Sequence, residues 1–140
     1  MNEKELKCIK KILIKRYPET NGDIDYIFDN GDTVLMKAIK TQNKIVMYNV
    51  LKYARNHNIS NKDGYTALMY ASKYEFLDIV KLLVEKYRVD IFKLTKKLNK
   101  ASDISKSEEI IDYLKRMEKL EYIKADLEYL NIKDRNFKLV

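Results

Sequence analysis

The chain has 140 residues, a length that suits one domain with a sizeable buried core. Its 46% apolar and 35% charged residues are typical of a globular protein and exclude a disordered chain. Its apolar runs are shorter than the roughly 20 residues that cross a bilayer, and its charged beginning does not resemble a signal peptide. We therefore expect no membrane association. The formal net charge of +7 favours acidic partners over basic ones.

Cysteine usage points to a reducing compartment. Cys8 is the single cysteine, so the chain cannot form an internal disulfide. We therefore expect a cytoplasmic protein. On the N-terminal helix, Cys8 is expected to be a small packed residue and not a nucleophile.

The first expected element is an amphipathic helix over residues 5–17. Its apolar residues recur at helical spacing and share one face: Leu6, Ile9, Leu13 and Tyr17. The turn after it contains Gly22, a residue that adopts positive φ at little cost.

The next two elements begin with closely similar stretches. GDTVLMKAI at residues 31–39 and GYTALMYAS at residues 64–72 share Gly, Thr, Leu, Met and Ala, with a period of 33 residues. The glycine permits a tight turn, and the threonine hydroxyl can cap the helix that follows. The leucine and alanine are three apart and lie on one helix face. A period near 33 residues predicts a stacked-helix solenoid.

Each of these stretches is followed by a second expected helix, over residues 43–53 and 75–86. A third, degraded copy follows over residues 100–115, with Ala101, Ile104 and Ser105 at its core positions. Its turn position falls at Leu98, 34 residues after Gly64. One residue is therefore inserted, and we place it within residues 86–90.

A long helical pattern ends the chain, over residues 107–130. Ser107 is expected to cap its start, and apolar residues recur every three or four positions: Ile110, Leu114, Met117, Leu120, Ile123, Leu127 and Leu130. One helix, or two broken near Lys119, would close the open end of the stack. The alternative is a helix exposed for a partner. We favour the cap, because terminal repeats need a polar outer face.

The recurring G-x-T-x-L-x-x-A pattern resembles the signature of the ankyrin repeat. The resemblance implies an all-α fold, an ankyrin-type α-solenoid of helix-turn-helix repeats with N- and C-terminal capping helices. The expected organisation is a single domain, 1–140. It comprises a capping half-repeat at 3–24, repeats at 25–57 and 58–91, a degenerate repeat at 92–117, and a C-terminal cap or tail at 118–140.

The chain also departs from the family pattern. The family's helix-starting proline is replaced by Val34 and Ala67, and its histidine by Met36 and Met69. In the family, that histidine and the threonine bond between neighbouring turns. Because the histidine is replaced, the loss of this bond predicts a less rigid stack.

The residues that could support catalysis or bind a cofactor or metal are sparse. His57 is the only histidine, so a histidine cluster cannot form, and we expect it to pack in a loop under the next repeat. The acidic residues near the first turn do not match EF-hand spacing and are expected to serve turns and caps. We predict neither an enzyme nor a cofactor or metal site.

The resemblance places a binding groove along the turn tips and inner helices. Carried over by position, its residues are Asp29, Asn30, Asp32, Lys40, Thr41, Lys62, Asp63, Tyr65, Lys73, Tyr74, Lys96 and Lys97, with Asn99 and Lys106 beside them. They run from acidic through tyrosine-containing to basic. We expect Tyr65 and Tyr74 to be the anchors, because tyrosine gives large rigid contact area with a polar end.

We therefore predict a protein-binding adaptor whose partner carries an acidic patch. Short ankyrin proteins of this Lys-, Ile-, Asn- and Tyr-rich composition resemble those of large DNA viruses and intracellular bacteria, which act on host proteins in the cytosol or nucleus. One alternative is nucleic-acid binding by interleaved Lys and Tyr, disfavoured by the interspersed acids. Another is a self-assembling structural protein, although we expect a monomer.

Overall fold

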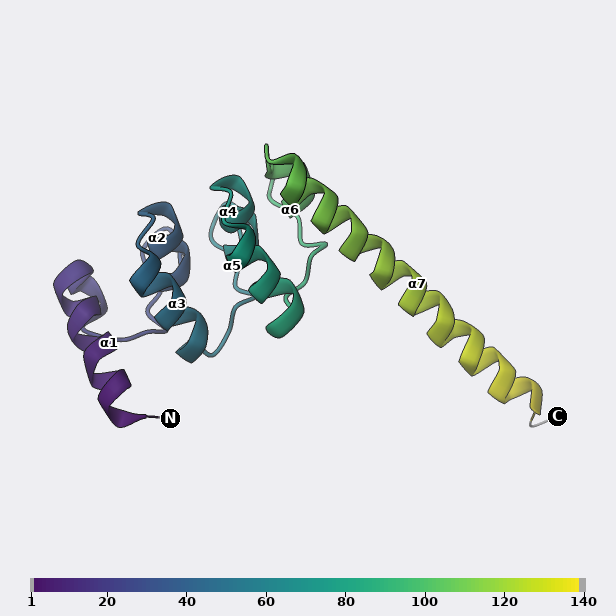
Figure 1. Cartoon of the computed structure of the whole chain (residues 1–140), viewed down its shortest axis with the longest axis horizontal. Helices are drawn as coiled ribbons and strands as arrows, with labels where there is room; N and C mark the ends of the chain where they lie inside the picture. The colour runs from purple at the N-terminus through teal and green to yellow at the C-terminus, as the bar shows by residue number, and fades with distance from the viewer. Residues whose placement is uncertain (1, 139–140) are drawn as a thin grey trace.

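The computed structural model describes the fold of residues 2–138 and the side chains of residues 2–133. Its helices stand in chain order as a row, from which the last helix runs away (Figure 1). The elements are α1 (Glu3–Arg16), the 3-10 turn η1 (Pro18–Thr20), α2 (Val34–Lys40), α3 (Lys44–Tyr53), α4 (Ala67–Lys73), α5 (Leu77–Lys81), the π-helical turn η2 (Leu82–Lys86), α6 (Ala101–Ile104) and α7 (Glu108–Lys138).

The repeats stack through their inner helices α2, α4 and α6. Helix α2 packs on α3 within its repeat and on α4 of the next, and α4 packs on α5 and α6. Helix α1 packs on α3 and covers the N-terminal end of the row. Its Ile9, Leu13 and the following Tyr17 are buried, as the amphipathic pattern predicts. The helical solenoid expected from the repeat is therefore confirmed.

The repeated threonines begin the inner helices as expected. The amide of Met36 donates to the Thr33 hydroxyl at 3.1 Å, and that of Met69 donates to Thr66 at 3.3 Å. In the second repeat the thioether of Met69 also accepts from the Thr66 amide at 3.4 Å. Here methionine makes a local contact at the position of the family's histidine.

Three tight loops, which we call fingers, precede the inner helices: residues 27–33, 60–66 and 94–100. Gly31 and Gly64 adopt positive φ at their tips. A Cβ on Gly31 would lie 2.9 Å from the amide nitrogen of Lys62, and one on Gly64 would lie 2.9 Å from Cα of Thr95. The next finger therefore excludes a side chain at both positions. Leu98 holds the equivalent place in the third finger at φ 64° and is 73% exposed.

The inserted residue of the second repeat is taken up just before the place that we expected. The amide of Tyr87 donates to the carbonyl of Leu82, five residues earlier, so η2 holds one more residue than an α-helical turn. Arg88 then adopts φ 50°, where the family usually has a glycine. The insertion thus widens the last helical turn and leaves the following link in register.

The C-terminal helix caps the stack with its first half and leaves it with its second half. Ser107 caps its start, because the amide of Ile110 donates to the Ser107 hydroxyl at 3.4 Å. The side chains of Ile110, Tyr113 and Leu114 are buried. Beyond Lys119 every described side chain is exposed, and the helix continues unbroken to Lys138. Of the two expected alternatives the structure has the single long helix, but only its first half closes the stack, so the expectation that the whole segment forms the cap is wrong.

The reason lies in the spacing of the apolar residues. Each residue advances about 100° around an α-helix, so steps of three and four must alternate to keep one face. Leu114, Met117, Leu120 and Ile123 follow one another in three successive steps of three. Ile123 therefore lies about 180° around the helix from Leu114. The apolar stripe has rotated off the face that meets the repeats.

Candidate protein-binding surface

The tips of the three fingers form a continuous ridge. The amide of Lys62 in the second finger donates to the carbonyl of Asn30 in the first at 3.1 Å. The amide of Lys96 in the third finger donates to the carbonyl of Asp63 in the second at 3.0 Å. These bonds join the loops edge to edge, so the tip side chains are held at fixed spacing by backbone contacts.

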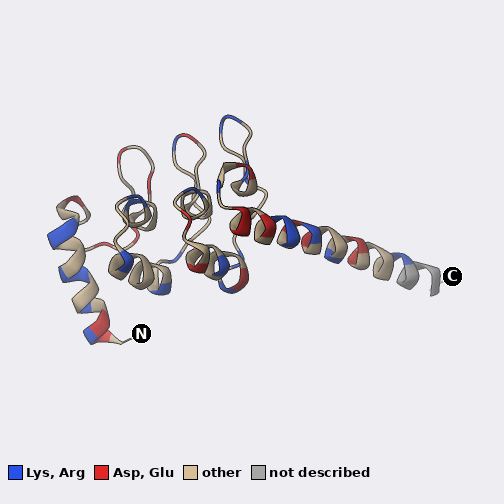
Figure 2. Cartoon of the chain, turned by 45° about the horizontal axis from the view of Figure 1, so that its top comes forward, with Lys and Arg blue, Asp and Glu red and all other residues tan. Residues whose placement is uncertain are grey.

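Charge changes sign along this ridge. In Figure 2 the fingers rise above the inner helices, with acidic colour on the first and basic colour on the third. The first tip exposes Asp29, the second exposes Lys62 and Asp63, and the third exposes Lys96 and Lys97. Their side chains make no salt bridge within the part of the chain that the structure describes.

Asp32 belongs to the interior of the stack and not to its surface. Its side chain is 2% exposed, and its carboxylate accepts from the Lys40 ammonium at 2.6 Å and from the Asn61 amide at 2.7 Å. Asn30 donates to the same carboxylate at 2.9 Å. A direct contact between Asp32 and a partner is therefore excluded in this fold. Lys40 is half-buried and paired with it.

Asn61 links this carboxylate to the second repeat. Its amide nitrogen donates to Asp32 and also lies 3.0 Å from the Tyr70 hydroxyl, while its amide oxygen accepts from the backbone of Asp63 and Tyr65. The Lys40 ammonium lies 4.5 Å from the centre of the Tyr70 ring, within cation–π range. The network joins the two repeats beneath the ridge.

Electrostatics at this network favour the ionised pair. Burial by itself raises the pKa of the Asp32 carboxyl, but the hydrogen bonds from Asn61, Lys40 and Asn30 outweigh it and hold the pKa below its usual range. Burial likewise lowers the pKa of Lys40, but its hydrogen bond to Asp32 reverses this and leaves the pKa raised. Both groups are thus charged at neutral pH.

Two tyrosines frame the middle of the surface. Tyr65 is half-buried and stacks on Tyr70 with ring centres 4.9 Å apart. The exposed Lys73 places its ammonium 6.0 Å from the centre of the Tyr65 ring and 5.9 Å from that of Tyr74. The half-buried Tyr65 and Tyr74 therefore both lie near one lysine ammonium.

The remaining predicted residues lie at the ends of the inner helices or on the third finger. Thr41 directly follows α2 as its C-terminal capping residue. Its hydroxyl lies 2.8 Å from that of Tyr17 and donates to the carbonyl of Lys37. Lys106, which follows α6, and Asn99, on the third finger, are both exposed. All three residues are thus exposed, but Thr41 uses its hydroxyl for hydrogen bonds within the protein.

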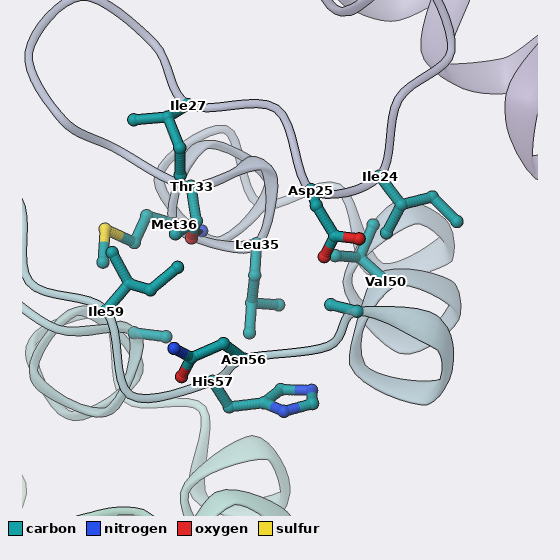
Figure 3. A pocket seen from close by; sticks show the side chains of 12 residues that line it. Ile24, Asp25, Ile27, Thr33, Leu35, Met36, Val50, Asn56, His57 and Ile59 are labelled. Atoms are coloured by element: carbon teal, nitrogen blue, oxygen red, sulfur yellow. Dashed lines mark hydrogen bonds between the residues drawn. The ribbon is translucent and has the colours of Figure 1, made fainter.

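A small cavity between the first two repeats offers no ligand site. It measures about 20 Å³ and is lined by apolar side chains such as Leu35 and Met36 together with Asp25, Asn56 and His57 (Figure 3). A space of this size holds about one water molecule. His57 stacks on Tyr87 at 4.1 Å, and its Nε2 lies 2.8 Å from the carbonyl oxygen of Leu51, so it packs between repeats as expected.

Cys8 differs from expectation. The N-terminal helix turns it to solvent, so it is not the small packed residue that the sequence predicts.

Within residues 2–133 the structure brings together no group of three His, Cys, Asp or Glu side chains that could hold a metal ion. No described helix is both long enough and apolar enough to cross a membrane.

Sequence reasoning missed Asn61 and Tyr70, the two residues that join the repeats below the ridge. Asn61 lies 33 residues after Phe28, at a position where the two copies differ. That difference was the available signal. The difference could not show that Asn61 binds Asp32, because these two side chains meet only when neighbouring fingers stack.

Comparison with known proteins identifies the class. The family model of ankyrin repeats, with three copies, matches residues 1–94. The chain therefore belongs to the ankyrin-repeat family, whose repeats are protein–protein interaction modules. A search of curated proteins found no match.

Among solved structures, the chain is similar to the ankyrin repeat domain of Bcl-3, a member of the IkappaB protein family. The sequence identity is 24% and the TM-score is 0.61. The match covers 75% of this chain and 44% of that one. At this identity the likeness shows the fold alone.

Proposed function

We propose that this chain is an adaptor that binds another protein along the finger ridge and the ends of the inner helices. The observation that carries the proposal is the ridge itself, three fingers fixed to one another by backbone hydrogen bonds while their charged tips stay exposed. A rigid ridge loses little conformational entropy when a partner docks.

The charge order of the ridge sets the partner's chemistry. Lys96 and Lys97 at the third finger call for an acidic patch, and Asp29 at the first finger calls for basic or neutral groups. Opposed charges at the two ends would fix the partner's direction as well as its position. Tyr65 and Tyr74, beside Lys73, supply the aromatic contact between those ends.

The adaptor that we propose is a cytoplasmic monomer, and the lone cysteine supports the cytoplasmic location. The Lys-, Ile-, Asn- and Tyr-rich composition supports an adaptor that a virus or intracellular bacterium directs at a host protein.

Against nucleic acid as the partner, the first and second tips expose Asp29 and Asp63, which repel phosphates. The ridge lacks the continuous basic track that a phosphate backbone requires.

The test is affinity capture from the native cell with partners identified by mass spectrometry. Two double variants of the ridge, Lys96→Glu/Lys97→Glu and Tyr65→Ala/Tyr74→Ala, serve as baits beside the parent chain. The control bait is Lys7→Glu/Lys44→Glu, which makes the same change in net charge as the lysine variant but lies on α1 and α3. Circular dichroism confirms that each is folded. We expect the first two to lose the partner that the parent and the control retain. Equal capture by all four baits would refute the ridge as the binding surface.

A further inference from the structure

The second half of α7 exposes an apolar stripe, whose first residue, Leu120, borders a shallow hollow lined also by Val84 and Phe92. Leu120, Ile123, Leu127 and Leu130 are between 51% and 56% exposed. Their spacing of three, four and three residues places them within about one quarter of the helix circumference. Helix α7 carries them away from the row of repeats (Figure 1). A contiguous apolar stripe of this kind is typical of an interaction surface.

The stripe has the geometry of a coiled-coil seam. With Leu120 and Leu127 at position a and Ile123 and Leu130 at position d, it fills two heptads. The flanking positions e and g then carry Lys119, Lys124, Asp126, Asn131 and Lys133. The border of the stripe is therefore mostly basic.

These flanking charges disfavour a second copy of the chain as the occupant. In a parallel pair, Lys119 of each helix would face Lys124 of the other. In an antiparallel pair with Leu120 opposite Leu130, Lys124 would meet Lys124 and Asp126 would meet Asp126. Like charges would thus face each other in both arrangements, and they would oppose self-pairing.

We propose that residues 119–133 of α7 form a second docking element, separate from the finger ridge, which pairs with an amphipathic helix of another protein. That helix carries a Leu- or Ile-rich seam bordered by Asp and Glu. The apolar residues of the two seams bury one another, and the acidic border meets Lys119, Lys124 and Lys133. Charges at e and g select the partner, and the apolar seam provides the affinity.

The test uses the full chain and two synthetic helical peptides, each about three heptads long. Both have the same Ile and Leu seam, and their e and g positions are Glu in the acidic probe and Lys in the basic probe. A scrambled acidic peptide of equal composition controls for general attraction to a basic protein. Binding is measured by fluorescence anisotropy at physiological salt.

We expect the parent chain to bind the acidic probe at least about tenfold more tightly than the basic and scrambled peptides. Ile123→Ser/Leu127→Ser, which leaves the net charge unchanged, should abolish this binding. The matched control Tyr129→Ser/Ile132→Ser alters exposed apolar residues elsewhere on the same helix and should retain it. Lys119→Glu/Lys124→Glu should lose the preference for the acidic probe.

Several outcomes would overturn the proposal. They are no binding of the acidic probe, equal binding of the scrambled peptide, or equal loss in the seam variant and its control. A concentration-dependent dimer that Ile123→Ser/Leu127→Ser disrupts would assign the seam to a second copy. Seam-dependent binding to phosphatidylserine vesicles, without discrimination between the peptides, would assign it to a lipid surface.

Discussion

At the scale of single residues, position in the repeat does not decide whether a side chain is available to a partner. Asp29 and Asp32 are three residues apart in the same finger, yet Asp29 is exposed and the Asp32 side chain is 2% exposed. The difference arises because Asn61 of the next finger reaches across to the Asp32 carboxylate. A conversion of Asp32 into a surface residue would require the fingers to separate.

We predict that Asp32→Ala lowers the free energy of unfolding by about 2–3 kcal/mol at pH 7, because it leaves the half-buried Lys40 ammonium without its acceptor and removes one of the two acceptors of the Asn61 amide. Asp29→Ala, at the exposed tip, should change it by less than about 0.5 kcal/mol. Urea denaturation measures both values. Equal losses would show that Asp32 does not join the repeats.

The same network predicts a pH dependence. Because the pKa of Asp32 is lower in the folded protein than in the unfolded chain, its stabilisation is complete above the unfolded value, near about 4, and is lost as pH falls through the folded value. The stability difference between the parent and Asp32→Asn should therefore shrink as pH falls below about 4. A difference independent of pH would contradict the lowered pKa.

At the scale of elements, α7 shows how one apolar pattern can serve two purposes. Its first half closes the stack with Ile110, Tyr113 and Leu114, and its second half carries Ile123 and Leu127 into solvent. The pattern of threes and fours alone favours a single amphipathic helix. Alternating steps of three and four would keep the stripe on one face, whereas successive steps of three turn it around the helix. The run of such steps from Leu114 to Ile123 separates the apolar faces of the two halves.

We expect two leucine truncations in this helix to differ sharply. Leu114→Ala should lower the free energy of unfolding by about 3 kcal/mol, because Leu114 is 1% exposed and truncation leaves a cavity. Leu127→Ala should change it by no more than about 0.5 kcal/mol, because that side chain already faces water. Chemical denaturation of both variants is the measurement. A large loss for Leu127→Ala would mean that the second half packs on the stack in solution.

At the scale of the whole molecule, the chain combines a compact row of repeats with an unsupported helix. Each repeat contacts only its neighbours, so stability is a sum over the row. The inner helices α2 and α4 pack on neighbours along the row. The helix beyond Lys119 is exposed throughout its described part, and there Tyr122 still lies against Phe92, with ring centres 5.3 Å apart. Local stability should therefore fall steeply at Lys119.

Amide hydrogen exchange should display this gradient. We predict the slowest exchange in α2 and α4, approaching the limit set by global unfolding. Residues 123–133 should open at a cost of only about 1 kcal/mol, because they lie beyond the contact of Tyr122 with Phe92 and a helix with so few tertiary contacts is marginal in water. Comparable protection along the whole of α7 would show that the second half is covered in the free protein.

The sequence by itself determined the fold and the elements of the row. Gly31 and Gly64, with Thr33 and Thr66, mark turns and caps whose requirements are local, so a pattern at fixed spacing is enough to predict them. The order of charges along the finger tips follows from the same fixed spacing, so it too could be predicted from the sequence. Whether that ridge binds a partner stays a prediction.

Only the tertiary structure decided which of the predicted surface residues are free. The burial of Asp32 and its contact with Asn61 depend on two fingers about one repeat apart, and no local pattern encodes that meeting. The exposure of Cys8 was decided in the same way. Burial depends on where neighbouring elements end, and that is settled only when the helices pack.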